Sequence, residues 1–265
     1  MNSTFLEAVA KDLLQKYGSN LSRIAVVFPN KRASLFMNEY LARLSDGPLW
    51  SPCYTTISDL FREKSELMVA DPIKLVCDLY RSYTEITGKD ETLDRFYGWG
   101  QLLLADFDDI DKNMADAHKV FANLRDIHEL DDIDYLSPEQ KNILKSFFHN
   151  FADDHLSKLK ERFLSLWCNL EEIYRDFNQR LAAQGLAYEG ALYRSVVEAQ
   201  ADYEFDKYVF VGFNMLQQVE QRLFLTLKAQ GKACFYWDFD HYYLANNEAG
   251  HYINGYLTQF PNELS

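Results

Sequence analysis

The feature that most limits the possible folds is a set of three short apolar runs that lie far apart in the chain. Ile24–Phe28 is IAVVF, Tyr208–Val211 is YVFV, and Ala233–Trp237 is ACFYW. Continuous runs of β-branched and aromatic residues are typical of strands buried on both faces, as in parallel sheets covered by helices. A helical pattern follows each of the first two runs. The sequence therefore predicts an α/β fold built around a parallel sheet.

Short signals place further elements in the first 70 residues. A helix capped by Thr4 is predicted before the first strand, because a capping-box pattern precedes an apolar stripe. A short strand is expected over Tyr54–Thr56. A helix that Ser58 caps is expected to run from there to about Met68.

From Asp71 to about Gln200 the pattern is helical and strand signals are nearly absent. Pro72 suits the first turn of a helix behind an Asp cap. Ser137–Gln140 forms a second capping box, and Leu159–Leu181 repeats apolar residues at helical spacing. We therefore expect a discontinuous α/β domain, residues 1–70 and 201–265, with an all-helical subdomain, residues 71–200, inserted into it.

Composition excludes several classes of protein. No apolar run approaches the roughly 20 residues that span a bilayer, and no signal peptide precedes the first helix. The four cysteines and six histidines are scattered, so we expect reduced thiols, no metal site and a cytoplasmic location. The net charge of −13 argues against a wholly basic nucleic-acid clamp. The last five residues, PNELS, do not resemble a domain end, and we expect a longer protein.

Ligands of parallel α/β sheets bind at the carboxyl ends of the strands. After the first strand, Asn30, Lys31 and Arg32 open a helix, where backbone N–H groups and cations favour a phosphate or an acidic partner. The alternative interpretation is a pair of solvated surface charges. These three residues are the predicted contacts to DNA or to a partner protein.

The other strand ends offer less chemistry. After Val211 the chain continues GFNML, without the acidic residues that a nucleotide hydrolase uses to hold Mg²⁺. Asp238, Asp240 and His241 follow the last strand and form the alternative site of a divergent ATPase, although caps and surface charges are the simpler interpretation. The sequence has no GxxxxGK[ST], GxGxxG or GxSxG motif, and only 11 glycines. No residue is assigned a catalytic role, and no cofactor is expected.

Two patterns in the helical segment are interpreted as structural. The acidic run Asp106–Asp111 lacks the glycine and the bidentate Glu of a calcium loop, so a solvated helix face or an acidic contact surface is expected. The aromatic residues Phe96, Tyr97 and Trp99 have the ring faces needed to stack on bases, but core packing is the preferred interpretation.

The stretch YEFDKYVFVGFNMLQQVEQRLFLTLKAQGKACFYWDFD, residues 203–240, resembles the part of superfamily I helicases that carries the Walker B strand, its helix and the next sensor strand. In that alignment Gly212 and Phe213 occupy the positions of the Walker B Asp and Glu. Leu216 stands at a second Asp, and Gln221 matches a helix Gln. Of the sensor motif only Asp238 remains, and Asn214 belongs to the same degenerate region.

Three parts of the sequence are similar to the AddB subunit of bacterial AddAB helicase–nucleases. They are the GF pair after this strand, the stretch VVFPNKRASLFMNEYLA and the stretch WSPCYTTISDLF. This resemblance implies a RecA-like, P-loop-like parallel sheet, corresponding to helicase domain 1A, with a 1B-like helical insertion. It also implies a PD-(D/E)XK nuclease domain beyond residue 265 and an AddA-like helicase subunit as a partner. AddB subunits usually retain a Walker A loop near the N-terminus, and a first helix beginning near Thr4 leaves no room for one.

Three hypotheses follow. The first is a non-catalytic, helicase-like module of a DNA repair or recombination helicase–nuclease, which guides DNA or holds a partner subunit. The second is a divergent ATPase that depends on Mg²⁺ and nucleotide. The third is a protein-interaction module unrelated to DNA.

Overall fold

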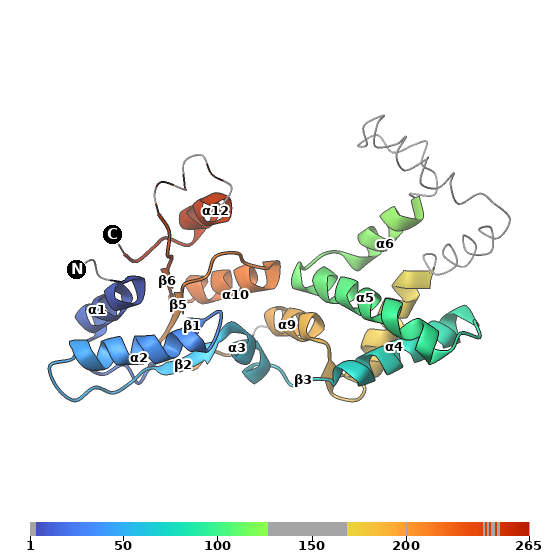
Figure 1. Ribbon diagram of the computed structural model, residues 1–265, viewed down its shortest axis with the longest axis horizontal. Coiled ribbons are helices and arrows are strands. Elements are labelled where there is room, and N and C mark those ends of the chain that lie inside the picture. Colours follow the sequence, from blue (N-terminus) through green and yellow to red (C-terminus); the bar gives the residue numbers. More distant parts are fainter. Residues whose placement is uncertain are drawn as a thin grey trace. The chain divides into compact units, whose positions relative to one another are not determined.

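The computed structural model describes residues 4–126, 169–199, 201–240, 242, 244, 247 and 250–264 (Figure 1). The chain forms two compact units. Unit 1 consists of residues 1–65 and 193–265, and unit 2 of residues 66–192. The helix α9 (Glu189–Glu198) contains the second boundary.

Unit 1 is built on a parallel sheet with the strand order β2-β1-β5-β6. In the register Phe28 lies beside Thr56, and Val211 lies beside Tyr236, so neighbouring strands end at similar levels. All of β1 is buried, as its unbroken apolar run requires. The α/β class and the parallel sheet are thus confirmed. The strands are β1 (Ile24–Phe28), β2 (Cys53–Thr56), β5 (Lys207–Val211) and β6 (Ala233–Tyr236).

One face of this sheet is covered by α1 (Phe5–Tyr17) and α2 (Arg32–Leu44). The predicted start of α1 is confirmed, because the Thr4 hydroxyl accepts a hydrogen bond from the Glu7 amide at 3.3 Å. The buried side chains on this face alternate along each strand, as the two-residue period of a strand dictates. They include Val9, Leu13, Met37 and Leu41 of the helices and Val26, Phe28, Val209 and Tyr236 of the strands.

The alternate side chains of the strands form an aromatic core with α10 (Gln218–Ala229) and the end of α12 (His251–Gln259). The Phe224 ring lies 4.0 Å from that of Phe210 and 5.3 Å from that of Phe235, measured between ring centroids. The planes of these two ring pairs are tilted by 37° and 40°, and the packed rings bury a large apolar area.

The third helix, α3 (Ile57–Glu63), differs from the sequence prediction at both ends. Thr56, and not Ser58, is its cap: the Thr56 hydroxyl accepts from the Asp59 amide at 3.1 Å. Thr56 is the last residue of β2 and still has extended backbone angles, as an N-cap requires. The helix ends at Glu63 and does not reach Met68, which is the first residue of a strand.

Unit 2 is mainly helical, with one feature that the sequence did not indicate. Two strands of two residues each, β3 (Met68–Val69) and β4 (Leu186–Ala187), pair in parallel. The Asp71 cap of α4 is confirmed, because its carboxylate accepts from the Ile73 amide at 2.9 Å. The labelled helices lying wholly in the unit are α4 (Pro72–Thr87), α5 (Leu93–Lys112) and α6 (Ala117–Asp126), and residues 169–182 are also helical.

Aromatic side chains fill the core of unit 2. Phe96 is fully buried, and its ring centroid lies 4.2 Å from that of Trp99. Tyr97 and Trp99 are partly buried against the same core. Core packing, the preferred interpretation for these three residues, is confirmed.

Several sequence predictions lie outside the described residues. These are the capping box Ser137–Gln140, residues 159–168 of the expected long helix, and His241. Within the part of the chain that the structure describes, no helix is long and apolar enough to cross a membrane.

Candidate functional site at the carboxyl edge of the sheet

The connection after β1 is short. The Asn30 carboxamide oxygen accepts from the Arg32 amide at 3.1 Å, so α2 begins after Pro29–Lys31 alone. This connection contains no glycine, and a phosphate loop needs glycines for close backbone approach. Asn30 therefore shapes the turn, while Lys31 and Arg32 are exposed.

The two cations of this turn differ in their surroundings. The Lys31 ammonium lies 3.1 Å from the Asp59 carboxylate. A hydrogen bond from the Thr56 hydroxyl, and then the Lys31 ammonium, lower the pKa of the Asp59 carboxyl. In contrast, the Arg32 guanidinium has no ion pair among the described residues. Arg32 is thus the more available of the two cations.

The connection after β5 places an aromatic ring where the helicase resemblance expects a catalytic Glu. Phe213 is only 5% exposed, and its ring centroid lies 5.4 Å from that of Phe224. Gly212 before it has a φ of 72°, which favours glycine, and its amide donates to the Tyr236 carbonyl at 3.0 Å. Phe213 is therefore a core residue of unit 1.

The far end of this connection is held by side chains from two helices. The Leu216 amide donates to the Tyr256 hydroxyl at 3.1 Å, and this hydroxyl is 3.4 Å from the Leu216 carbonyl oxygen. The side-chain Nε2 of Gln221 donates to the same carbonyl at 3.2 Å. Gln221, singled out by the resemblance, thus fixes the backbone of the loop. Asn214 and Met215, between the two anchored ends, are exposed.

Tyr256 was not identified from the sequence. It lies on α12, 40 residues from Leu216 in the chain, and no local pattern links the two. Its position four residues before Phe260 puts the two residues on the same side of a helix, which predicts that Tyr256 is buried but does not predict its contact with Leu216.

After β6 the chain turns to the surface. Trp237 is buried, and its indole N–H donates to the Phe260 carbonyl at 2.8 Å. Asp238 and Asp240 are exposed. The Asp240 carboxylate accepts from the Tyr242 amide at 2.9 Å, which is a local capping role. Within the described residues, no group of three or more His, Cys, Asp or Glu side chains is placed to hold a metal ion.

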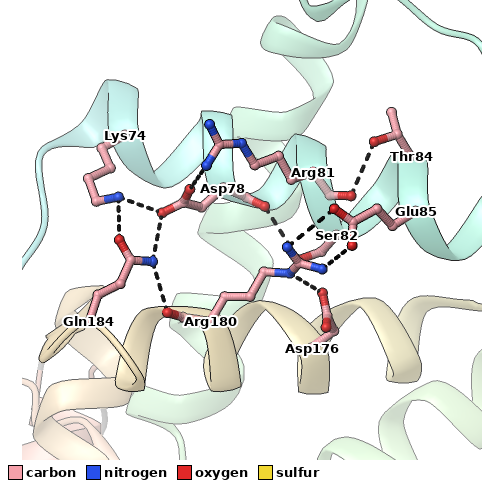
Figure 2. A network of polar contacts seen from close by, with 9 residues as sticks. All are labelled: Lys74, Asp78, Arg81, Ser82, Thr84, Glu85, Asp176, Arg180 and Gln184. Carbon is pink, nitrogen blue, oxygen red and sulfur yellow. Dashed lines mark hydrogen bonds and ion pairs between the residues drawn. The ribbon is translucent and has the colours of Figure 1, made fainter.

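Unit 2 contains an extended polar network between α4 and the helix at 169–182 (Figure 2). The Asp78 carboxylate, whose side chain is 4% exposed, lies 2.9 Å from the Lys74 ammonium and 3.4 Å from the Gln184 amide. One turn away, Arg180 contacts the carboxylates of Asp176 and Glu85. Every group that Figure 2 draws has a partner within the network, so we interpret it as a structural link between the two helices.

The acidic run in α5 is only in part the solvated face that the sequence predicted: Asp106 and Asp109 are exposed, whereas Asp108 is partly buried and Asp111 is buried. Asp111 is 1% exposed and accepts a hydrogen bond from the Tyr174 hydroxyl at 2.6 Å and another from the Tyr188 hydroxyl. Burial, followed by the Asp111 charge, raises the pKa of Tyr188 well above its usual value. Asp108 binds the Gly190 amide at 2.6 Å and lies 2.8 Å from the Lys112 ammonium. Much of this run therefore holds helices together.

No protein-family model matches the sequence, and no curated protein sequence matches it.

Proposed function

We propose that this chain is a non-catalytic, helicase-like module of a cytoplasmic DNA repair or recombination helicase–nuclease, similar to AddB. In this proposal the parallel sheet of unit 1 is a RecA-like sheet without ATPase activity, and unit 2 is the 1B-like insertion. The module guides DNA or contacts a partner subunit such as an AddA-like helicase. The nuclease domain of the whole protein lies beyond residue 265.

The observation that carries the proposal is the burial of Phe213 at the carboxyl edge of a parallel sheet. Motor ATPases place carboxylates at this edge to hold Mg²⁺ and orient water. Here the position is filled by a ring packed against Phe210 and Phe224. The glycine-free connection Pro29–Lys31 adds support, because it does not provide a backbone cradle for phosphates.

A thermal-shift titration with Mg-ATP tests the loss of nucleotide chemistry. A ligand at about 100 times its Kd adds about 2.7 kcal/mol to the free energy of unfolding. For a chain of this size that corresponds to a rise in Tm of about 5–10 °C. We expect no rise at millimolar Mg-ATP. A rise of several degrees that Asp238→Ala abolishes would instead support the divergent ATPase.

Binding of single-stranded DNA at several salt concentrations tests the DNA role. Each phosphate contact contributes about 0.7 to the slope of log K against log salt for single strands. We expect Arg32→Ala to reduce this slope by about that amount. The control is Arg43→Ala on the same helix, because Arg43 is already paired with Glu7 at 2.5 Å. Absence of salt-dependent binding would favour a protein-interaction module unrelated to DNA.

A further inference from the structure

The connection after β5 is anchored at both ends, and its middle is exposed. Its first half is fixed by the Gly212 amide and the buried Phe213 ring, and its second half by Tyr256 and Gln221, which both contact the backbone of Leu216. Met215 lies between these anchors and is 67% exposed. An apolar side chain on a pre-ordered backbone loses little conformational entropy on binding, as is typical of protein-interaction residues.

The two strands that flank β5 are followed by side chains of opposite charge. In the strand order β1-β5-β6, Arg32 follows β1 and Asp238 follows β6, with the Met215 connection between them. The cation of Lys31 is paired with Asp59, so Arg32 is the unpaired cation after β1 in the described chain. After β6, Asp238 is exposed, and the exposed Asp240 stays anionic although it caps a turn. Neither Arg32 nor Asp238 has an ion pair among the described residues.

We propose that this edge binds a protein segment that carries an acidic, an apolar and a basic side chain in that order along the segment. The edge consists of Arg32, Asn214, Met215 and Asp238. The inference rests on the proposed function, because it assigns a surface to the subunit-contact role. An acidic side chain complements Arg32, an apolar one covers Met215, and a basic one complements Asp238. A nucleic acid can place a phosphate on Arg32, but it does not cover the whole edge, because the Asp238 carboxylate repels a phosphate beside it.

The spacing suits a helix. Two inter-strand steps separate β1 from β6, a distance of about 10 Å. Residues seven apart on a helix are separated by about 10.5 Å along its axis. A helical peptide with Glu at one position, Leu three or four residues later and Lys seven residues later therefore spans a distance equal to that between β1 and β6.

The test uses three synthetic helical peptides that differ only in the outer charges: Glu–Leu–Lys, Glu–Leu–Glu and Lys–Leu–Lys. Binding is followed by NMR of the protein labelled with ¹³C at its methionine methyl groups. Met68 is also 67% exposed, but it lies in unit 2 and serves as a matched control for non-specific contact. Met37 is fully buried and reports on global changes.

We expect the Glu–Leu–Lys peptide to shift the Met215 methyl signal and leave the Met68 signal in place. It should bind about threefold to tenfold more tightly than the other two peptides. Arg32→Glu should transfer the preference to Lys–Leu–Lys, and Asp238→Lys should transfer it to Glu–Leu–Glu.

Three results would overturn the docking proposal. They are no shift at Met215 with any peptide, equal affinity for all three peptides, and a Met215 shift caused by single-stranded DNA in place of the peptides. The first two would leave the proposed function standing, because its own tests are the Mg-ATP and DNA titrations. The third would show that DNA binds at the edge, so the docking of a protein segment would be withdrawn and the DNA role of the proposed function would be kept.

Discussion

Replacing Phe213 by Glu introduces the side chain that the helicase resemblance expects at this position. The ring is 5% exposed and packs against Phe210 and Phe224, so the substitution removes a core aromatic. Truncation of a buried Phe costs about 3–5 kcal/mol. A carboxylate in its place adds a desolvation penalty, or takes up a proton at about 1.4 kcal/mol per unit of pKa shift. We therefore expect F213E to lower the free energy of unfolding by at least about 4 kcal/mol at pH 7.

Urea unfolding of F213E and of a matched control, Asn214→Glu, measures this loss. The control adds the same charge one residue away, where the side chain is exposed, and should stay within about 0.5 kcal/mol of the wild type. Burial raises the pKa of the introduced carboxyl in the folded state. The deficit should therefore be smallest below the unfolded pKa of about 4.3 and grow as pH rises through the folded value. If F213E were as stable as N214E at pH 7, Phe213 would not be a core residue, and the inactivation argument would fail.

Three further changes test other parts of the account. Asp111→Ala leaves two tyrosine hydroxyls without their shared acceptor and should cost about 2–6 kcal/mol in urea unfolding, at about 1–3 kcal/mol for each hydroxyl. Asp109→Ala on the exposed side of the same helix should cost under about 0.5 kcal/mol. The Tyr256 hydroxyl accepts a hydrogen bond from the Leu216 amide, so Tyr256→Phe should speed hydrogen exchange of that amide by about tenfold. Substitution of the exposed Tyr252 by Phe should leave this exchange rate unchanged. Burial, the largest effect, raises the pKa of Tyr203 to about 12. The contribution of Tyr203 to the free energy of unfolding is therefore complete below about pH 10 and declines as pH rises towards 12. Tyr203→Phe should make the free energy of unfolding less dependent on pH between about pH 10 and 12.

Elements whose cause is local could be predicted from the sequence. β1 matches its predicted bounds because a continuous apolar run suits a strand buried on both faces. Thr4 and Asp71 were identified as caps because the residue type and the pattern after it define the motif. The assignment of the cap to Ser58 was wrong by two residues, because Ser and Thr are both good caps and the position of the cap depends on where β2 ends.

Features that depend on distant partners could not be predicted. Asp111 is buried because hydroxyls from residues 63 and 77 positions away meet it, and its own neighbours only suggest a polar helix face. The strands β3 and β4 are too short to leave a pattern, and they exist because two remote segments meet. At the candidate site, Asn30, Lys31, Arg32 and Phe213 were found from their place after a strand, whereas the Tyr256 anchor depends on tertiary packing.

The central claim is that the carboxyl edge of this sheet no longer carries out nucleotide chemistry. The most direct test is the rate of phosphate release from Mg-ATP, measured on the intact chain with and without single-stranded DNA. The account predicts a rate equal to the protein-free blank under both conditions. DNA-stimulated turnover that is lost in Asp238→Asn but kept in Asp109→Asn would contradict it, because the β6 carboxylate would then be serving an active ATPase.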